Sequence, residues 1–482
     1  MNRAKWTVAA VLCLAALARP QSPAELLEKI SRLERDAAAR DQKIAELERG
    51  LSERHAAEDA ARLETAINAL TSDDAPAAVV APKSLGIVLG GQVRIRSEYR
   101  TVKNYGAGVD DDEDFVLQRT RLHVDADVLD DVRVFVQLQD SRTWGEETNP
   151  LGDLEGVDIH QAFVDFKKVF DRVWTFRVGR QELLYGDQRL VSPLDWSAIG
   201  RSFDGVRTWY EGEGWQLDLF VMNIDENSLP TGGKSDDDRI FDGLYFHYTG
   251  LEKHEIDAYI FHRAFSDGTF TSEGGAAGDL EDATFGIRFK GATDGFSYSA
   301  EGDYQIGDRA GDDIGAYAWA LTFAYTFDHD WKPTIGVEWD FASGDDDAAD
   351  GDFGTFDPLF PFGHSYQGYL DVFAWRNSHD FVLRANVKPD EDYWVEAAVH
   401  YFMLDSDTDA WFNAAGLPIR RFAAGGVDNT IGWEIDLHCK YQLNRATALW
   451  FGYSHFFAGG YVDDTGDDPD ADWLWFQMTV TF

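Results

Sequence analysis

Apolar and polar residues alternate with a period of two over most of the chain, from residue 84 to 482. In the stretch 131–139, Val134 and the even-numbered residues share one apolar face, whereas Arg133 and Gln137 share the other. Successive side chains of a β-strand point to opposite faces of the sheet. The pattern therefore predicts strands with one apolar face and one face that carries full charges.

The same alternation recurs at 332–341 and 432–441 and defines a series of segments separated by turn residues. Eighteen strands are predicted, at 85–100, 115–128, 132–141, 158–168, 173–182, 203–212, 215–224, 239–249, 254–264, 283–291, 296–307, 314–327, 332–342, 379–388, 393–404, 428–442, 446–457 and 472–482. The segment 366–376 also alternates, but a nineteenth strand would break the order of the connections, so we place it inside the loop 343–378.

The connections between these segments are alternately short and long. The short ones lie at Asp130-Asp131, Phe170-Asp171, Glu213, Leu251-Glu252, Thr293-Asp294, Asp328 to Asp330, Pro389-Asp390 and Leu443-Asn444. A soluble sandwich also alternates, with its polar face in water. Tight turns on one side and long loops on the other are typical of an outer-membrane barrel. The sequence thus predicts an all-β membrane protein, an 18-stranded antiparallel transmembrane β-barrel over 84–482, with both ends on the periplasmic side.

Aromatic residues support this interpretation, because rings with a polar tip settle at membrane interfaces. On the predicted outer face lie Trp174, Phe176, Trp215, Phe246, Phe285, Phe289, Tyr317, Trp319, Phe323, Tyr325, Trp339, Phe451 and Tyr453. The last strand alternates up to a terminal Phe482 and resembles the assembly signal of bacterial outer-membrane barrels.

The N-terminal region has a different character. Residues 1–18 have a basic start, a short apolar core and an Ala-x-Ala end, which predicts a secretory signal peptide. Residues 22–71 carry an apolar stripe in steps of four and three, which predicts a periplasmic α-helical coiled coil. The stripe is too narrow to bury itself alone, so we expect a homo-oligomer, with a trimer as the working assumption. The alternative is a single amphipathic helix on the barrel or the membrane. Residues 72–83 form a Pro/Ala linker.

Composition narrows the function further. The 482 residues include 43 basic and 86 acidic side chains, a net charge of −43. Such a charge argues against nucleic acid as a partner, because phosphates need a basic surface. After signal cleavage Cys439 is the single thiol, and its parity places it towards lipid, where we expect it to be inert. No GxSxG, HExxH or P-loop motif is present, so we expect a protein that is not an enzyme.

The inward parity of the strands collects charged residues of both signs. The predicted basic residues of the lumen are Arg94, Arg96, Arg119, Arg121, Arg133, Arg177 and Arg207, with Arg288, Arg384 and Lys440 on later strands. The predicted acidic wall consists of Glu301, Asp303, Glu338, Asp340, Glu396, Glu434 and Asp436. Rings of charge set the selectivity of channels, and the planar guanidinium suits carboxylates. The alternative is that these charges pair with one another and only fill the barrel.

Aspartate runs fall in the predicted outer loops, at 110–114, 236–238, 345–352 and 463–472. Ca²⁺ binding is one reading of them, although none has the spacing of an EF-hand loop. We expect solvated loops, because runs of like charge repel and stay hydrated. No cofactor is required.

Two long connections carry a family resemblance: GRQELLYGDQRLVSPLDWSAIGRSFDG at 179–205 and FDPLFPFGHSYQGYLDVFAWRN at 356–377. Together with the strand GWEIDLHCKYQLN and the stretch GYSHFFAGGYV near the C-terminus, they resemble the alginate-export family of outer-membrane channels. The resemblance implies an eighteen-stranded barrel with an arginine-rich conduit for an anionic uronate polymer. It also implies that Arg180, Arg189 and Arg201 of the first connection guide carboxylates.

The sequence as a whole predicts a channel in the bacterial outer membrane for the passive passage of hydrophilic solutes, with anionic saccharides or uronates as the expected class. Two alternatives remain open. One is a general porin without polymer specificity. The other is a structural anchor that tethers the cell wall through the coiled coil.

Overall fold

The computed structural model describes residues 86–105, 109–146, 156–226 and 238–482. The predicted signal peptide, coiled coil with its trimer, and linker lie outside the described residues. Within the described chain, no helix is long and apolar enough to cross a membrane.

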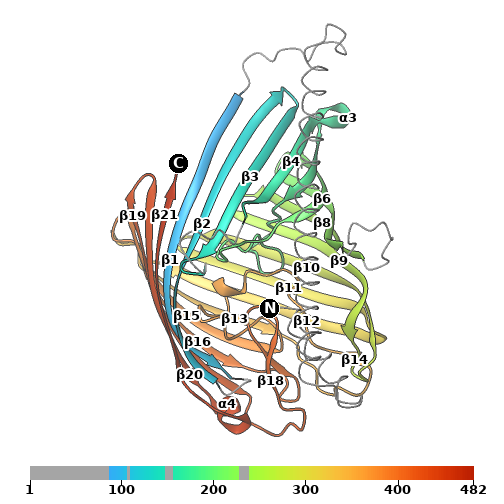
Figure 1. Ribbon diagram of the computed structural model, residues 1–482, viewed down its shortest axis with the longest axis vertical. Helices are drawn as coiled ribbons and strands as arrows, with labels where there is room; N and C mark the ends of the chain where they lie inside the picture. The colour runs from blue at the N-terminus through green and yellow to red at the C-terminus, as the bar shows by residue number, and fades with distance from the viewer. Residues whose placement is uncertain (1–85, 106–108, 147–155, 227–237) are drawn as a thin grey trace, which may run out of the picture. The chain divides into compact units, whose positions relative to one another are not determined.

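The described residues form one closed β-barrel (Figure 1). Its strands are β1 (Gly86–Asn104), β2 (Val109–Leu129), β3 (Val132–Thr143), β4 (Asp158–Lys168), β5 (Trp174–Gln181), β6 (Phe203–Gly212), β7 (Trp215–Glu226), β8 (Asp238–Leu251), β9 (His254–Thr271), β10 (Ala277–Thr293), β11 (Phe296–Arg309), β12 (Asp312–Thr326), β13 (Thr334–Ala342), β15 (Ser378–Val387), β16 (Tyr393–Met403), β19 (Thr430–Asn444), β20 (Thr447–Ala458) and β21 (Ala471–Thr481). Each pairs antiparallel with its neighbour, and β1 pairs with β21 to close the ring. Closure leaves no unpaired strand edge in the lipid.

Smaller elements lie in the connections. They are α3 (Val169–Arg172), β14 (Asp352–Phe353), the 3₁₀ turn η1 (Gly363–Ser365), β17 (Ala410–Phe412), β18 (Pro418–Arg421) and α4 (Gly460–Thr465). β14 runs parallel to β12 and is the nineteenth strand of the sheet, whereas β17 and β18 form a separate hairpin.

All eighteen predicted strands are therefore confirmed, and the segment 366–376 is not a strand. The hairpin of β9 and β10 is longer than predicted, because β9 continues to Thr271 and β10 begins at Ala277. Backbone pairing satisfies its own polar groups whatever the side chains are, so a hairpin can extend into water beyond the alternating part of its sequence.

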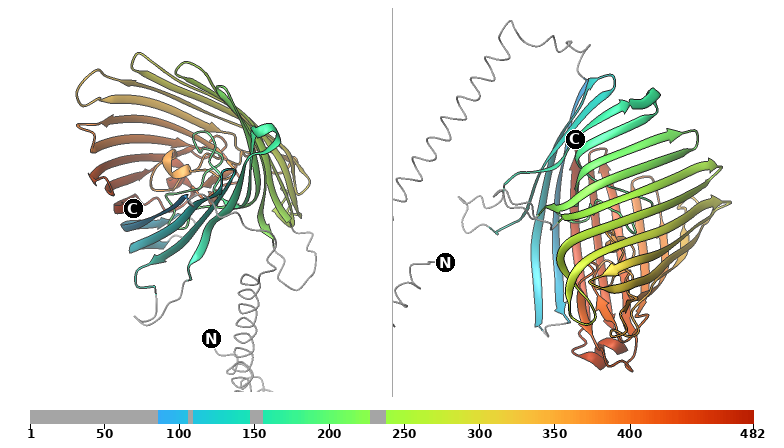
Figure 2. Two further views of the ribbon diagram at one scale, coloured as in Figure 1. Left: turned by 90° about the horizontal axis from the view of Figure 1, so that it is seen from above. Right: turned by 90° about the vertical axis from the view of Figure 1, so that its right-hand side faces the viewer.

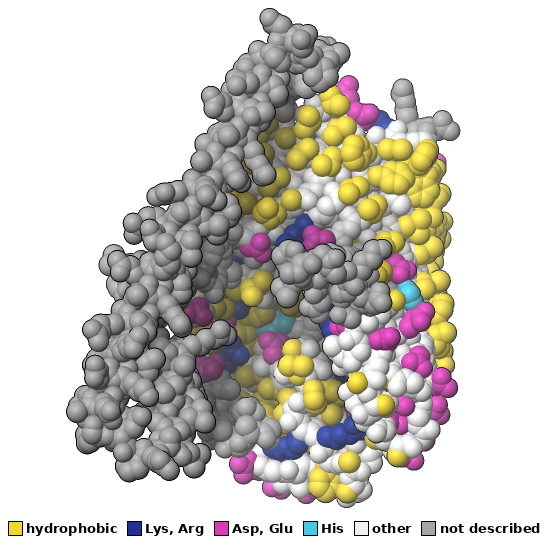
Figure 3. Space-filling model, turned by 45° about the vertical axis from the view of Figure 1, so that its right-hand side comes forward, with side chains coloured by type: hydrophobic (Ala, Val, Ile, Leu, Met, Phe, Trp, Pro, Cys, Tyr) yellow, Lys and Arg dark blue, Asp and Glu magenta, His cyan; other side chains and the backbone are white. Residues whose placement is uncertain are grey.

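The outer face of the barrel is apolar in its middle, as the alternation of apolar and polar positions predicts. Phe285, Tyr317, Phe323, Phe451 and Phe476 are each more than 40% exposed. Figure 3 shows hydrophobic side chains gathered over the upper part of one face, whereas acidic side chains gather lower down, towards the end with the long loops. Contact with lipid explains the exposure of these rings, so no partner protein is needed to cover them.

Two connections fold back into the barrel and are called here the inner loops, residues 182–202 and 343–377. Seen from above in Figure 2, the ring of strands encloses coil segments rather than an empty bore. The loops pair with each other, since the Phe360 N–H donates to the Leu190 carbonyl (2.8 Å) and the Ser192 N–H donates to the Phe360 carbonyl (3.0 Å). Leu183, Val191 and Phe356 are fully buried where these loops pack against the strands.

Candidate functional site

Four arginines of β1 and β2 stand side by side on the inner face and are called here the arginine cluster: Arg94, Arg96, Arg119 and Arg121. Arg94 lies directly opposite Arg119, and Gln92 lies opposite Arg121. All four arginine side chains are at least nine-tenths buried. Like charges that face each other across two strands are destabilising unless another group compensates them.

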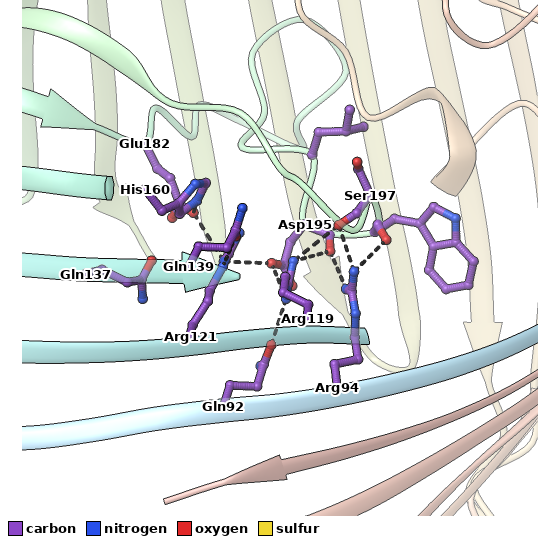
Figure 4. A network of polar contacts seen from close by, with 12 residues as sticks. Gln92, Arg94, Arg119, Arg121, Gln137, Gln139, His160, Glu182, Asp195 and Ser197 are labelled. Atoms are coloured by element: carbon purple, nitrogen blue, oxygen red, sulfur yellow. Dashed lines mark hydrogen bonds and ion pairs between the residues drawn. The ribbon is translucent and has the colours of Figure 1, made fainter. Parts of the chain in front are cut away.

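The first inner loop supplies that compensation (Figure 4). Arg94 donates to the carbonyls of Asp195 (2.5 Å), Trp196 (3.0 Å) and Ser197 (2.7 Å). The Asp195 carboxylate lies 2.8 Å from Arg119 and 3.1 Å from Arg121. Four backbone carbonyls, including that of Ile199 at 3.5 Å from Arg121, and one carboxylate thus converge on the arginine cluster.

The remaining donors of the cluster also have partners. Arg96 donates to the Trp196 carbonyl (2.8 Å) and pairs with Glu98 (2.7 Å). Arg121 donates to Gln139 (2.7 Å) and lies 3.5 Å from Glu182. Three acidic side chains, those of Asp195, Glu98 and Glu182, meet four guanidinium groups, so the cluster keeps a positive excess that neutral carbonyls solvate.

The local sequence makes this loop conformation accessible. Gly200 has φ +78°, and a Cβ there would meet the Arg121 guanidinium at 2.7 Å. Glycine alone adopts this region without a steric cost. Leu194, which follows Pro193, also has a positive φ of 52°. Such strain in a non-glycine residue persists only where the surrounding contacts fix it.

The opposite wall carries four carboxylates, called here the acidic cluster: Glu301 and Asp303 of β11, and Glu338 and Asp340 of β13. Arg189 of the first inner loop enters this cluster, at 2.5 Å from Glu338 and 2.6 Å from Asp340. Its guanidinium also stacks on the Tyr366 ring at 3.9 Å. Burial disfavours the charge of Arg189, but Asp340 and Glu338 outweigh burial and raise its pKa well above the ordinary value.

The other two predicted loop arginines lie in different surroundings. Arg201 donates to the carbonyls of Ser192 (3.0 Å) and Phe360 (2.5 Å), so it connects the two inner loops. Burial without a carboxylate partner lowers the pKa of Arg201 to about 10. Arg180 is 40% exposed and faces Asp204 at 3.5 Å. Arg180 shares the outward parity of Trp174, Phe176 and Val178 on β5, so its exposed side chain lies on the outer face of the barrel and not in the lumen.

The remaining predicted lumen arginines pair with carboxylates of adjacent strands. Asp165 bridges Arg133 (3.0 Å) and Arg177 (2.7 Å). Further pairs are Arg207 with Asp218, Arg288 with Asp257, and Arg384 with Glu396. The prediction of a basic wall did not include Asp165, Asp218 and Asp257, although their strand parity also points inward.

The last two members of the predicted acidic wall, Glu434 and Asp436, are fully buried. Glu434 accepts a hydrogen bond from the Leu370 N–H (2.9 Å), and Asp436 accepts one from the Ser454 hydroxyl. The second inner loop is therefore fixed to the acidic wall as well.

The described part of the chain contains no group of three or more side chains with the geometry of a metal site. The aspartates of the long loops hold backbone N–H groups instead. Asp345, for example, accepts from the Asp347 N–H (3.1 Å), and Asp428 accepts from the Thr430 N–H (2.7 Å).

Comparisons with known proteins agree with the barrel fold. The family model for alginate export matches residues 86–472. The comparison with curated protein sequences finds no match.

Among solved structures, three outer-membrane proteins of Pseudomonas aeruginosa are similar in fold. OccK11 (OpdR) has 11% identity over 82% of this chain and 96% of its own, with a TM-score of 0.53. OpdO has 12% identity over 82% and 97%, with a TM-score of 0.55. The outer membrane protein OprD has 13% identity over 82% and 93%, with a TM-score of 0.53. The chain belongs to the alginate export family and is a porin-like β-barrel of the bacterial outer membrane.

Proposed function

We propose that this barrel is a passive channel for anionic saccharides, with uronates as the substrate class, and that the arginine cluster binds their carboxylates. The observation that carries the proposal is the way the cluster is neutralised. Arg94 donates to neutral backbone carbonyls of the first inner loop, whereas Arg119 and Arg121 also meet the Asp195 carboxylate. The inward arginines of the strands outside the cluster pair with carboxylates of the barrel wall.

A guanidinium held by carbonyl groups gains more from a carboxylate than one already held by an ion pair. Charge-assisted hydrogen bonds are roughly twice as strong as neutral ones. An arriving uronate therefore competes well against the carbonyls of residues 195–197. It competes poorly for Arg133 or Arg177, which share Asp165.

The test is single-channel conductance of the refolded protein in planar bilayers, with uronate oligomers added. We expect discrete conductance that uronates block. Arg94→Gln weakens the block about tenfold or more, because each lost charge-assisted bond is worth roughly 1.5–3 kcal/mol. Arg133→Gln serves as the matched control, since that arginine is already paired.

Two outcomes would favour the alternatives. Conductance that ignores uronates identifies a general porin. A complete absence of conductance favours the structural anchor. The structural observation that supports this alternative is the buried packing of both inner loops inside the barrel.

A further inference from the structure

A hollow of about 450 Å³ lies on the inner face near the short-turn end of the barrel, beside the arginine cluster. Trp394, Lys440, Trp450 and Gln477 line it, and each comes from a different strand of the run β16, β19, β20 and β21. The strand register places these four residues in one row, which continues to Arg96 on β1. Because residues in register point to the same face, the row is contiguous on the lumen wall.

Lys440 is unlike the arginines around it. Its ammonium lies 4.0 Å from the centre of the Trp450 ring and 5.0 Å from that of Trp394. In the part of the chain that the structure describes, it makes these two ring contacts and no ion pair. The cation is therefore held in place by ring faces, while its hydrogen-bond donors stay available to an anion.

The walls of the hollow are rigid. Trp450 packs edge-on against Trp196 with ring centroids 5.1 Å apart, and its indole N–H donates to His438 (3.3 Å). Gln477 is only 8% exposed, and its amide oxygen has no hydrogen-bond partner among the described residues. A buried acceptor without a partner is costly unless a ligand or water satisfies it.

The chemistry of these groups selects one class of ligand. Indole rings bury the apolar C–H face of a pyranose ring, and the ammonium binds a carboxylate on that ring. The Gln477 amide oxygen and the exposed carboxylates of Glu391 and Asp392, which also line the hollow, accept hydrogen bonds from sugar hydroxyls. The same carboxylates repel any anion, and a uronate offsets this repulsion with the hydrogen bonds that its hydroxyl groups donate.

We propose that this indole–lysine hollow is a binding site for a single uronate residue at the periplasmic mouth of the barrel, next to the arginine cluster. The proposal rests on the proposed function for its substrate class and adds a site and a position to it. A uronate chain would contact the hollow before it reaches Arg96.

The experiment measures glucuronate binding to the detergent-solubilised barrel by titration calorimetry, and block of single-channel current by the same ligand added from each side. Glucose and acetate are the comparison ligands. We expect glucuronate to bind more tightly than either, and to block more effectively from the short-turn side. Lys440→Met weakens binding about tenfold, because it removes a charge-assisted bond, whereas Lys440→Arg retains binding.

Lys253→Met is the matched control, since Lys253 is an exposed lysine on another short turn, between β8 and β9. Trp394→Leu tests the stacking surface, with Trp394→Tyr as the conservative variant that keeps a ring. Heat-modified mobility on gels verifies that each variant folds.

Equal binding by Lys440→Met and the parent protein would overturn the inference, as would equal affinity for glucuronate and acetate. The two proposals fail separately. A channel that uronates block, with no effect of Lys440→Met, retains the function and loses the hollow. Calorimetric binding that depends on Lys440 in a barrel that does not conduct retains the hollow and loses the channel.

Discussion

The two walls of the lumen hold the same inner loop by different means. The arginine cluster binds residues 195–199 mainly through backbone carbonyls and one carboxylate, Asp195. The acidic cluster binds the same loop through one buried guanidinium, that of Arg189. The arginine cluster presents cations mainly to neutral acceptors of the loop, whereas the acidic cluster surrounds one cation of the loop with full negative charges.

The difference indicates which contact is exchangeable. Removing one partner of a buried ion pair leaves an uncompensated charge and is strongly destabilising. Replacing carbonyl acceptors with a solute carboxylate leaves every guanidinium satisfied. We therefore interpret Arg189 as the anchor of the first inner loop and residues 195–199 as its displaceable part.

The largest expected effect comes from breaking the anchor. Arg189→Met leaves Asp340 without a cation among the described residues and Glu338 with only Arg384, at 3.8 Å, and we expect a loss of about 3–5 kcal/mol in unfolding free energy. Guanidinium unfolding of the barrel in detergent, followed by tryptophan fluorescence, measures it. Arg180→Met is the control, because its exposed pair with Asp204 contributes at most about 1 kcal/mol. Equal losses in the two variants would contradict the anchor.

A smaller effect is expected when the loop carboxylate is removed from the arginine cluster. Asp195→Asn removes the carboxylate that competes for Arg119 and Arg121 but leaves the carbonyl contacts in place. We expect uronates to block the channel several-fold more tightly, on the order of fivefold, since one charge-assisted contact becomes available. The block must also weaken as ionic strength rises, because salt screens the attraction between the lumen and a carboxylate that is still in solution. An unchanged or weaker block would show that the loop carboxylate does not compete with solute.

The smallest effect concerns Asp345, at the start of the second inner loop. Burial, followed by a hydrogen bond with the Glu273 carboxyl, raises the pKa of Asp345 to about 7. The neutral form is thus favoured in the folded loops. Their stability is fully present below the ordinary pKa of an aspartate and decreases as pH rises through about 7.

We expect proteolysis of the loops at pH 8 to be faster than at pH 5.5. Each pH unit crossed changes the opening equilibrium by up to about tenfold. Asp345→Asn removes the difference, while Asp390→Asn, on a short turn, leaves it unchanged. Equal proteolysis rates at both pH values in the parent protein would contradict the assignment.

Much of the barrel follows from the sequence alone, because lipid on one side and polar groups on the other impose a strict period of two. The strand predicted at 132–141 is one example, since Val132, Val134 and Val136 separate from Arg133 without any knowledge of neighbours. The order of short and long connections also excluded 366–376 as a strand. A closed antiparallel barrel with alternating short and long connections needs an even number of strands, and this segment would have been the nineteenth. The inward position of the charged residues was likewise predictable, as Arg119 and Asp340 show.

The pairing of those charges was not predictable. Arg189 meets Glu338 and Asp340 across 149 and 151 residues of chain, and Asp195 meets Arg119 across 76. Periodicity records only which face a residue occupies, which is a local property of the backbone. Which charge meets which depends on how the inner loops fold back into the barrel, and that is set by long-range packing and by the cost of burying an unpaired charge. The sequence by itself determined the barrel and the charged residues of its lumen, and the tertiary structure decided which arginines pair with carboxylates and which are held by neutral carbonyls of the inner loop.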